Sequence, residues 1–256
     1  PTVNSTVSPK ALSISGIIVQ DKIYDGNNAA TVQGTPALIG VIGADSVALS
    51  GTPTFTFANA DAGNNKAIAV SGYTLIGSAA SNYSLSVLEG LTASILKDNQ
   101  TIVAVDSVAY KTFGDLTYSI TTTASSGLAV VYTSNNTAVA TVSNSGVVTI
   151  TGAGTATITV SQAGNNNYNP ATSLTHTITV QKANQTITFN PLSNKLATDL
   201  PFTLNGTTSS GLALTYSSSD PTIASISGNT VTILSSGTVT ITASQLGNTN
   251  YNTATE

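Results

Sequence analysis

Acid–base, nucleophilic and metal chemistry in proteins depends mainly on histidine, cysteine and clustered carboxylates, and this chain has few of them. Among 256 residues there are one histidine, His176, no cysteine and 11 acidic residues. Catalytic triads and zinc sites need several such groups that converge on one point. No acid pair, nucleophile–base pair or metal cluster is evident, so the sequence predicts that the chain is not an enzyme and uses no cofactor. His176 alternates with threonines, and we expect it to face outward from a strand.

The loop aspartates of the first 97 residues are the candidates for a cation site. Calcium needs about six to eight oxygen ligands, usually with several carboxylates among them. No Asp-x-Asp-x-Asp-Gly loop is present, and the best candidate ligands are Asp61, Asn59 and Asn64. The alternative is that the loop aspartates are solvated and that no metal binds. These aspartates are Asp21, Asp25, Asp45 and Asp61.

Three tyrosines each follow an asparagine near the end of their part of the chain: Tyr83, Tyr168 and Tyr251. One interpretation is a row of rings that stack on carbohydrate. The other is a structural corner, in which the ring packs in the core and the hydroxyl bonds to nearby backbone. Their repeated position favours the corner. Tyr24-Asp25-Gly26 also has two interpretations, a ligand contact or a turn, and the turn is favoured because glycine accepts a positive φ.

Two serines match a short modification pattern. Asp45-Ser46-Val47 and Asp106-Ser107-Val108 have the Asp-(Ser/Thr)-aliphatic pattern of O-glycosylation in bacteria with type IX secretion. Three-residue patterns also arise by chance, so the alternative is two unmodified serines. We therefore name Ser46 and Ser107 as candidate O-glycosylation sites.

Composition limits the classes of partner that the chain can have. Only 7% of its residues are charged, against roughly 25% in ordinary soluble domains. The formal charge is −4 and the few basic residues are scattered lysines, so we expect no nucleic-acid binding. The apolar runs are much shorter than the about 20 residues of a membrane helix, so we expect no membrane insertion. Abundant valine, isoleucine and threonine argue against disorder.

The elements that must position these residues are repeated. Four motifs of the middle of the chain recur in the same order further on, which indicates two copies of one unit. The pairs are Lys97–Ile102 with Lys182–Ile187, Ser125–Ala129 with Ser209–Ala213, Gly154–Thr159 with Gly237–Thr242, and Gly164–Asn169 with Gly247–Asn252.

Within each unit, apolar residues alternate with threonine or serine between turn residues, which is typical of half-buried β-strands. Turns every eight to twelve residues or so favour a sandwich. In the middle unit we expect strands at 100–105, 116–120, 129–134, 138–142, 147–151, 155–162 and 173–180. The last unit follows this order but has no counterpart of 173–180.

The sequence therefore predicts an all-β fold of three tandem Ig-like antiparallel β-sandwich modules in an elongated rod. Their expected bounds are 1–97, 98–181 and 182–256, and we expect the third module to lack its last strand. A cut in the chain is the favoured reason, and the alternatives are that this strand is disordered or is supplied by something else. A strand that rises roughly 3.3 Å per residue gives modules of about 35–40 Å and a rod of about 100–120 Å. Short linkers should restrict bending more than a glycine-rich tether would.

Residues 10–97 resemble the YDG/MBG-type repeat of large bacterial adhesins over nearly their whole length. The resemblance lies in Lys22–Gly26, Gly43–Val47, Asp61–Gly63 with Lys66–Val70, and Ser81–Leu85. The rest resembles bacterial Ig-like repeats through the Gln-Thr-Ile opening, the Ser-Ser-Gly-Leu turn and the Gly-Asn-x-x-Tyr-Asn loop. Such a resemblance implies an extracellular array on a bacterial surface, common with type IX secretion, and it implies architecture more than mechanism.

The expected function is an extracellular structural and adhesive stalk that spaces a terminal domain from the bacterial cell. Its expected partners are neighbouring repeats of the same chain, and surface glycans or other cell-surface proteins. The alternative is a set of glycan- or protein-binding accessory modules of a secreted polysaccharide-degrading enzyme.

Overall fold

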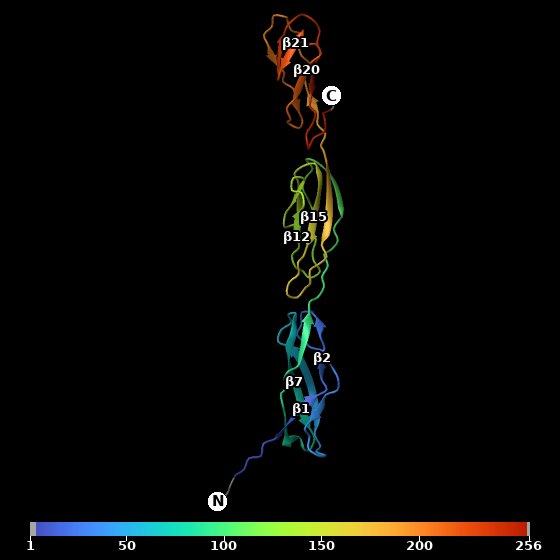
Figure 1. The fold of residues 1–256 in the computed structure, drawn as a ribbon, viewed down its shortest axis with the longest axis vertical. Coiled ribbons are helices and arrows are strands. Elements are labelled where there is room, and N and C mark those ends of the chain that lie inside the picture. Colours follow the sequence, from blue (N-terminus) through green and yellow to red (C-terminus); the bar gives the residue numbers. More distant parts are fainter. Residues whose placement is uncertain (1–3, 255–256) are drawn as a thin grey trace. The chain divides into compact units, whose positions relative to one another are not determined.

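The computed structural model describes residues 4–254, which form β-strands and loops with a single short helix (Figure 1). That helix is the 3-10 turn η1 (Ala80–Asn82). No helix among the described residues has the length and apolar character needed to cross a membrane. The predicted all-β fold is confirmed.

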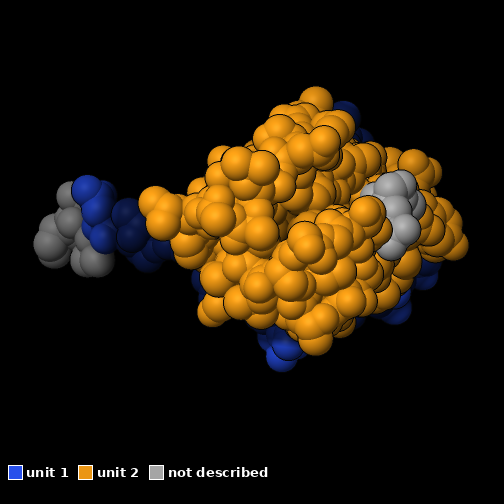
Figure 2. All heavy atoms as spheres, turned by 90° about the horizontal axis from the view of Figure 1, so that it is seen from above, with its two compact units in different colours: residues 1–102, 124–129, 162–172 blue, residues 103–123, 130–161, 173–256 orange. Residues whose placement is uncertain are grey.

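Two compact units divide the described residues (Figure 2). Unit 1 comprises the residues up to 102 together with 124–129 and 162–172. Unit 2 comprises 103–123, 130–161 and the residues from 173 onward. This two-unit division does not test the expected module bounds at 97/98 and 181/182. The division into three modules stays a prediction, and we call 1–97, 98–181 and 182–256 the first, second and third segments.

Nine strands form in the first segment. They are β1 (Lys10–Ser15), β2 (Ile18–Val19), β3 (Lys22–Ile23), β4 (Val32–Gln33), β5 (Ala37–Ile39), β6 (Ala48–Phe57), β7 (Gly63–Ile76), β8 (Tyr83–Leu85) and β9 (Thr92–Leu96). The sheets have the orders β3-β9-β7-β6, β5-β1-β8 and β2-β4. The main hydrophobic cluster contains Phe57 and Ile95, each 1% exposed, and lies on the four-stranded sheet.

In the second segment, seven strands form two sheets. They are β10 (Val108–Thr112), β11 (Tyr118–Ser119), β12 (Val131–Ser134), β13 (Ala140–Val142), β14 (Val147–Ile150), β15 (Gly154–Ser161) and β16 (Leu174–Gln181). The sheet orders are β10-β16-β15-β12 and β11-β14-β13. In β15, Ala156, Ile158 and Val160 are buried and alternate with half-exposed residues, as the period of two predicts.

One strand expectation in this segment is wrong. Residues 100–105 were expected to form a strand, but they make only an isolated bridge, from Ile102 to Ala124. The first strand of the sheet is instead β10, which pairs in parallel with β16 from Val108–Thr177 to Thr112–Gln181. A pairing between residues so far apart in the chain leaves no local turn or hairpin signal that the sequence pattern could show.

The third segment also has seven strands, but its sheets are smaller. They are β17 (Ile187–Thr188), β18 (Phe202–Thr203), β19 (Thr207–Thr208), β20 (Thr215–Ser218), β21 (Ala224–Ser227), β22 (Thr230–Ile233) and β23 (Ile241–Ser244). The sheet orders are β17-β19, β18-β22-β21 and β20-β23. Leu204, Ala224 and Val231 form its buried cluster.

An open groove of about 460 Å³ lies in the third segment, between residues 192–197 and 237–241. By the sequence repeat, these two stretches correspond to β10 and β15 of the second segment. In that segment β16 lies between β10 and β15. Among the described residues of the third segment, no strand takes the place of β16.

The core of the second segment gives a direct stability test. We expect Ile158→Ala to lower its free energy of unfolding by about 2–5 kcal/mol, because the side chain is fully buried and its removal leaves a cavity. Val131→Thr, at a residue that is 54% exposed in β12, should change it by less than about 1 kcal/mol. Urea unfolding followed by circular dichroism measures both. An equal effect of the two variants would contradict the described packing.

Candidate functional site

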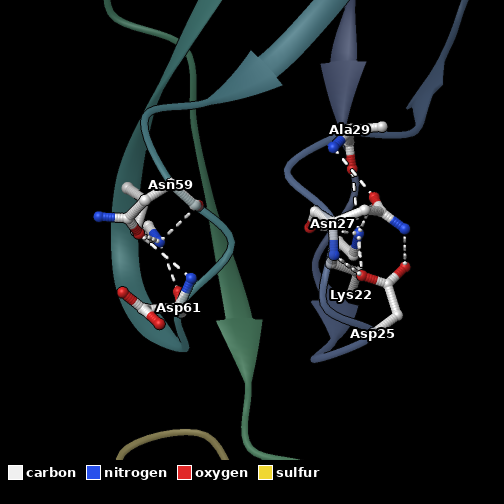
Figure 3. Close-up of polar contacts among 7 residues, drawn as sticks. Lys22, Asp25, Asn27, Ala29, Asn59 and Asp61 are labelled. Atoms are coloured by element: carbon white, nitrogen blue, oxygen red, sulfur yellow. Dashed lines mark hydrogen bonds and ion pairs between the residues drawn. The ribbon is translucent and has the colours of Figure 1, made fainter.

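Lys22 lies at the centre of a polar loop in the first segment (Figure 3). Its Nζ donates to Asn27 Oδ1 at 2.9 Å and to the carbonyls of Asn27 and Ala29 at 3.2 Å. It also pairs with Asp25 Oδ1 at 2.7 Å. The ammonium group is therefore surrounded by oxygen atoms, in the way that a bound cation would be.

A second lysine has the same kind of surroundings. Lys66 Nζ donates to Asn59 Oδ1 at 2.6 Å, to the Asn59 carbonyl at 3.0 Å, and to the Asp61 carbonyl. Figure 3 shows Asn59 and Asp61 in this loop. These are two of the candidate calcium ligands, and the third, Asn64, is exposed. The lysine charge already balances the oxygens that calcium would use, so a metal ion would have to displace it.

Among the described residues, no group of three or more histidine, cysteine or acidic side chains could hold a metal ion. Calcium binding at these residues therefore stays a prediction, and a calcium ion would compete with the Lys66 ammonium group for the same oxygens. In the described geometry the positive charge among these loop oxygens comes from lysine.

Asp25 takes part in a local bend as well as in the ion pair. Its Oδ1 accepts the Asn27 N–H at 3.0 Å, and Gly26 has φ +79°. The hydrogen bond from Lys22 and then that from the Asn27 backbone hold the pKa of Asp25 below its ordinary value of 3.8. This geometry is that of the turn expected for Tyr24-Asp25-Gly26.

Tyr83 ties a distant loop to the start of β8. The residue is 6% exposed. Its hydroxyl donates to Asp45 Oδ2 at 2.6 Å and accepts the Ile42 N–H at 3.0 Å. The bond to Asp45 raises the pKa of Tyr83, because it stabilises the protonated hydroxyl. The contacts are those of a corner residue.

Tyr168 and Tyr251 make different contacts. In the part of the chain that the structure describes, neither hydroxyl has a hydrogen-bond partner. Instead the Tyr168 ring meets Tyr24 edge-on, with centroids 5.4 Å apart, and the Tyr251 ring meets Phe113 in the same way at 5.4 Å. Each contact joins a tyrosine to an aromatic residue of the preceding sequence segment.

The hydroxyl contacts expected of a corner belong to two other tyrosines of the repeat. Tyr132 accepts the Thr122 N–H at 3.0 Å, and Tyr216 accepts the Gly206 N–H at 2.9 Å. Neither tyrosine was predicted to have a role. The signal that could have found them is their shared place in the repeat, two residues before the end of β12 and of β20.

His176 does not face outward, and that expectation is wrong. The residue is 2% exposed in the central strand β16, where it shares a buried face with Ile178 and Val180. Its Nε2 lies 3.0 Å from the Tyr118 hydroxyl, and its Nδ1 bonds to the Asp106 carbonyl. Alternation places residues 176, 178 and 180 on one side of the strand, so the two apolar neighbours could have predicted this burial. With both ring nitrogens bonded, the histidine is a structural residue.

Two buried glutamines hold the Gly-Asn loops in place. Gln100 Nε2 donates to the Asn169 carbonyl at 2.7 Å, and Gln185 Nε2 donates to the Asn252 carbonyl at 2.7 Å. Their Oε1 atoms accept from Ser126 and Ser210, one in each copy. Both come from the Gln-Thr-Ile motif, to which the sequence analysis gave no chemical role.

The two candidate glycosylation serines, Ser46 and Ser107, are exposed. Their backbone carbonyls accept hydrogen bonds from the N–H groups of Ala79 and Thr177. Glycosylation at these residues stays a prediction.

Comparison with known families agrees with this architecture. Residues 8–93 match the YDG domain, and residues 117–164 match the family described as intimin, immunoglobulin-like domain. The chain carries a YDG domain followed by an intimin-type Ig-like domain. The resemblance inferred from the sequence is confirmed. Domains of these types are adhesion modules without catalytic function, and they point to a structural or adhesive role on a cell surface.

A search of curated proteins found no match. Among solved structures, Drosophila N-cadherin EC1-4 is similar at 11% identity and a TM-score of 0.31, over 91% of this chain and 71% of that chain. Protocadherin gammaB7 EC3-6 is similar at 14% identity and a TM-score of 0.28, over 87% of this chain and 69% of that chain. Surface layer protein SbsC, domains 1-6, is similar at 15% identity and a TM-score of 0.24, over 84% of this chain and 40% of that chain.

The ion pair between Lys22 and Asp25 should make stability depend on pH. Because the pKa of Asp25 is lowered in the folded state, the pair stabilises the fold above the ordinary value of 3.8 and is lost as the pH falls through the folded value. We expect Asp25→Asn to lower the melting temperature near neutral pH and to match the parent chain at about pH 2. In a Lys22→Met background the effect of Asp25→Asn near neutral pH should shrink, and an effect of undiminished size would contradict the pairing.

Intact-mass spectrometry tests the candidate glycosylation sites. Native material should show hexose-series additions that are lost from Ser46→Ala and Ser107→Ala chains. A native mass equal to that of the bare polypeptide would remove the prediction.

Proposed function

We propose that this chain is part of an extracellular stalk of a bacterial surface protein, which spaces a terminal adhesive or functional domain from the cell. The YDG and intimin-type Ig-like domains support a surface role of this kind. The stalk interpretation adds a mechanical task, in which β-sheet segments transmit force along the chain. Export by type IX secretion is part of the same proposal.

The proposal rests mainly on the backbone hydrogen bonds of the linker residues Asp98 and Ala183. Asp98 donates its N–H to the Asn167 carbonyl at 2.9 Å and accepts the Asn169 N–H at 2.8 Å. Ala183 makes the same two bonds, to the Asn250 carbonyl at 2.9 Å and from the Asn252 N–H at 2.9 Å. Each linker is therefore paired through both its N–H and its carbonyl, like a strand residue. A paired linker resists bending, whereas a free polar tether does not.

The second candidate function is a glycan-binding accessory region of a secreted polysaccharide-degrading enzyme. One observation favours it. Tyr110 is 74% exposed on β10, beside a shallow hollow that Lys111 and Tyr118 also line. An exposed aromatic ring is the usual platform for a sugar face.

A replacement experiment in the parent bacterium tests the stalk. Replacing residues 1–256 by an unrelated run of Ig-like domains of equal length should preserve adhesion, whereas deleting them should reduce it. Antibodies against the chain should label intact cells. If the replacement abolishes adhesion as fully as the deletion does, these residues bind the target themselves and the spacer role fails. Tyr110→Ala then distinguishes the glycan-binding alternative, because glycan binding should depend on that ring.

A further inference from the structure

We propose that the Asn-x-Asn-Tyr loop of each Ig-like repeat is a plug that binds the segment before it, and that the same plug fits both a YDG-type and an Ig-like neighbour. The first plug is residues 165–168 and the second is residues 248–251. Each binds a socket made of one aromatic ring and one backbone N–H. The inference does not depend on where the protein is located or on what it binds.

The first contact of each pair is a hydrogen bond from the socket backbone. Asn167 Oδ1 accepts the Ala62 N–H at 2.9 Å, and Asn250 Oδ1 accepts the Ala153 N–H at 2.9 Å. The first pair lies wholly within unit 1, and the second lies wholly within unit 2. The same side-chain atom is therefore used twice, at the same distance, on two different neighbours.

The second contact is an aromatic pair. Tyr168 meets Tyr24 at 5.4 Å and 78°, and Tyr251 meets Phe113 at 5.4 Å and 83°. Edge-to-face pairs at this separation are favourable because the positive ring edge meets the negative ring face. Phenylalanine and tyrosine both serve as the socket ring, so the ring and not its hydroxyl is what the plug recognises.

Hydrogen bonds within each plug fix the conformation of its loop. Asn165 Oδ1 accepts the N–H groups of Asn167 and Tyr168 at 2.8 and 2.9 Å. In the second plug, Asn248 makes the same bonds at 2.8 and 2.9 Å. A loop that is already ordered loses little conformational entropy when it docks.

Lysine and glycine complete the plug in both copies. Lys97 and Lys182 of the two linkers donate to the carbonyls of Asn165 and Asn248, each at 2.7 Å. A Cβ at Gly164 or Gly247 would lie 2.3 Å from the carbonyl of the plug tyrosine, so only glycine fits there. These lysines and glycines belong to motifs that recur in both copies of the repeat.

The two sockets share two short sequence features. The donor is the alanine of an Ala-Gly pair in both, and the ring is the aromatic residue of Lys22–Gly26 in the first and of Lys111–Asp115 in the second. The first socket is at the Asp61-Ala62-Gly63 entry to β7, and the second is at the Gly152-Ala153-Gly154 entry to β15. What they share is one donor and one aromatic edge. Such a simple requirement explains how a single array combines two kinds of domain, since a plug of one sequence suits either neighbour.

One difference between the sockets makes a selective variant possible. Asn167 Nδ2 also donates to Asp61 Oδ1 at 3.1 Å, whereas glycine stands before Ala153 in the second socket. An aspartate in place of Asn167 would bring two carboxylates together. An aspartate in place of Asn250 would keep the acceptor and meet no opposing acid.

Amide hydrogen exchange in the intact chain, measured by NMR, tests the plug. We expect Asn250→Ala to speed exchange of the Ala153 amide about two- to ten-fold, the range for loss of one ordinary hydrogen bond, and to leave the Ala62 amide unchanged. Asn167→Ala should do the reverse, so each variant is the control for the other. If Asn250 acted only within the third segment, Asn250→Ala would leave the exchange rate of the Ala153 amide unchanged.

The aspartate variants separate charge from shape. Asn250→Asp should leave the exchange of the Ala153 amide slow, whereas Asn167→Asp should speed exchange of the Ala62 amide. Adding Asp61→Asn to the Asn167→Asp chain should slow exchange of the Ala62 amide again. If a plug variant perturbs its own segment, Phe113→Ala in the socket offers a test that leaves the third segment untouched and should expose Ala153 in the same way. Unchanged exchange at Ala153 in both Asn250→Ala and Phe113→Ala chains would overturn the proposal.

Discussion

A buried glutamine amide at the start of each Ig-like repeat supports the rest of the junction. Gln100 and Gln185 each direct Nε2 at the carbonyl of the residue that follows the plug tyrosine, at 2.7 Å in both copies. A buried amide left without partners would destabilise the fold, so the loop must stay where it satisfies that group. Once the loop is held, its asparagine and tyrosine face the preceding segment, and the linker backbone finds its partners. The linker pairing and the socket contacts thus share the support of this buried hydrogen bond, which acts together with the bonds of Asn165 and Lys97 and of their counterparts.

A chain with so little charge and no disulfide depends on complete pairing of its polar groups. Among the described residues, every buried side-chain nitrogen and oxygen has a partner. His176 and the two glutamines are buried only because each finds partners on both sides. Lys22 and Lys66 of the first segment follow the same rule, because each ammonium group lies among oxygens of the kind that bind calcium in calcium-binding domains. In this arrangement the lysine ammonium groups hold the loop oxygens together.

The proposed stalk and the proposed plug both concern how neighbouring segments are joined, the stalk along the whole array and the plug at each junction. A stalk transmits force only as well as its junctions do, and the paired linkers supply that continuity within each unit. The plug adds a small contact that recurs at each junction. Its socket can lie in either type of domain. The open groove of the third segment is not part of the plug. It lies at the place that β16 occupies in the sheet of the second segment.

The sequence by itself determined the all-β fold, the repeat and the two families, because alternation, turn residues and repeated motifs are local patterns. It also placed the Asn-Tyr motifs and the Asp25 turn where local hydrogen bonds hold them. The prediction misplaced His176, although the residue alternates in register with the buried Ile178 and Val180, because a polar residue type was given more weight than the face it shares. Only the tertiary structure decided that Tyr168 and Tyr251 contact the preceding segment. Their partners, Tyr24 and Phe113, each follow a lysine by two residues and precede an Asp/Gly pair, but they lie far away in the sequence. A local pattern can mark such rings, whereas only the folded chain shows which tyrosine each ring contacts.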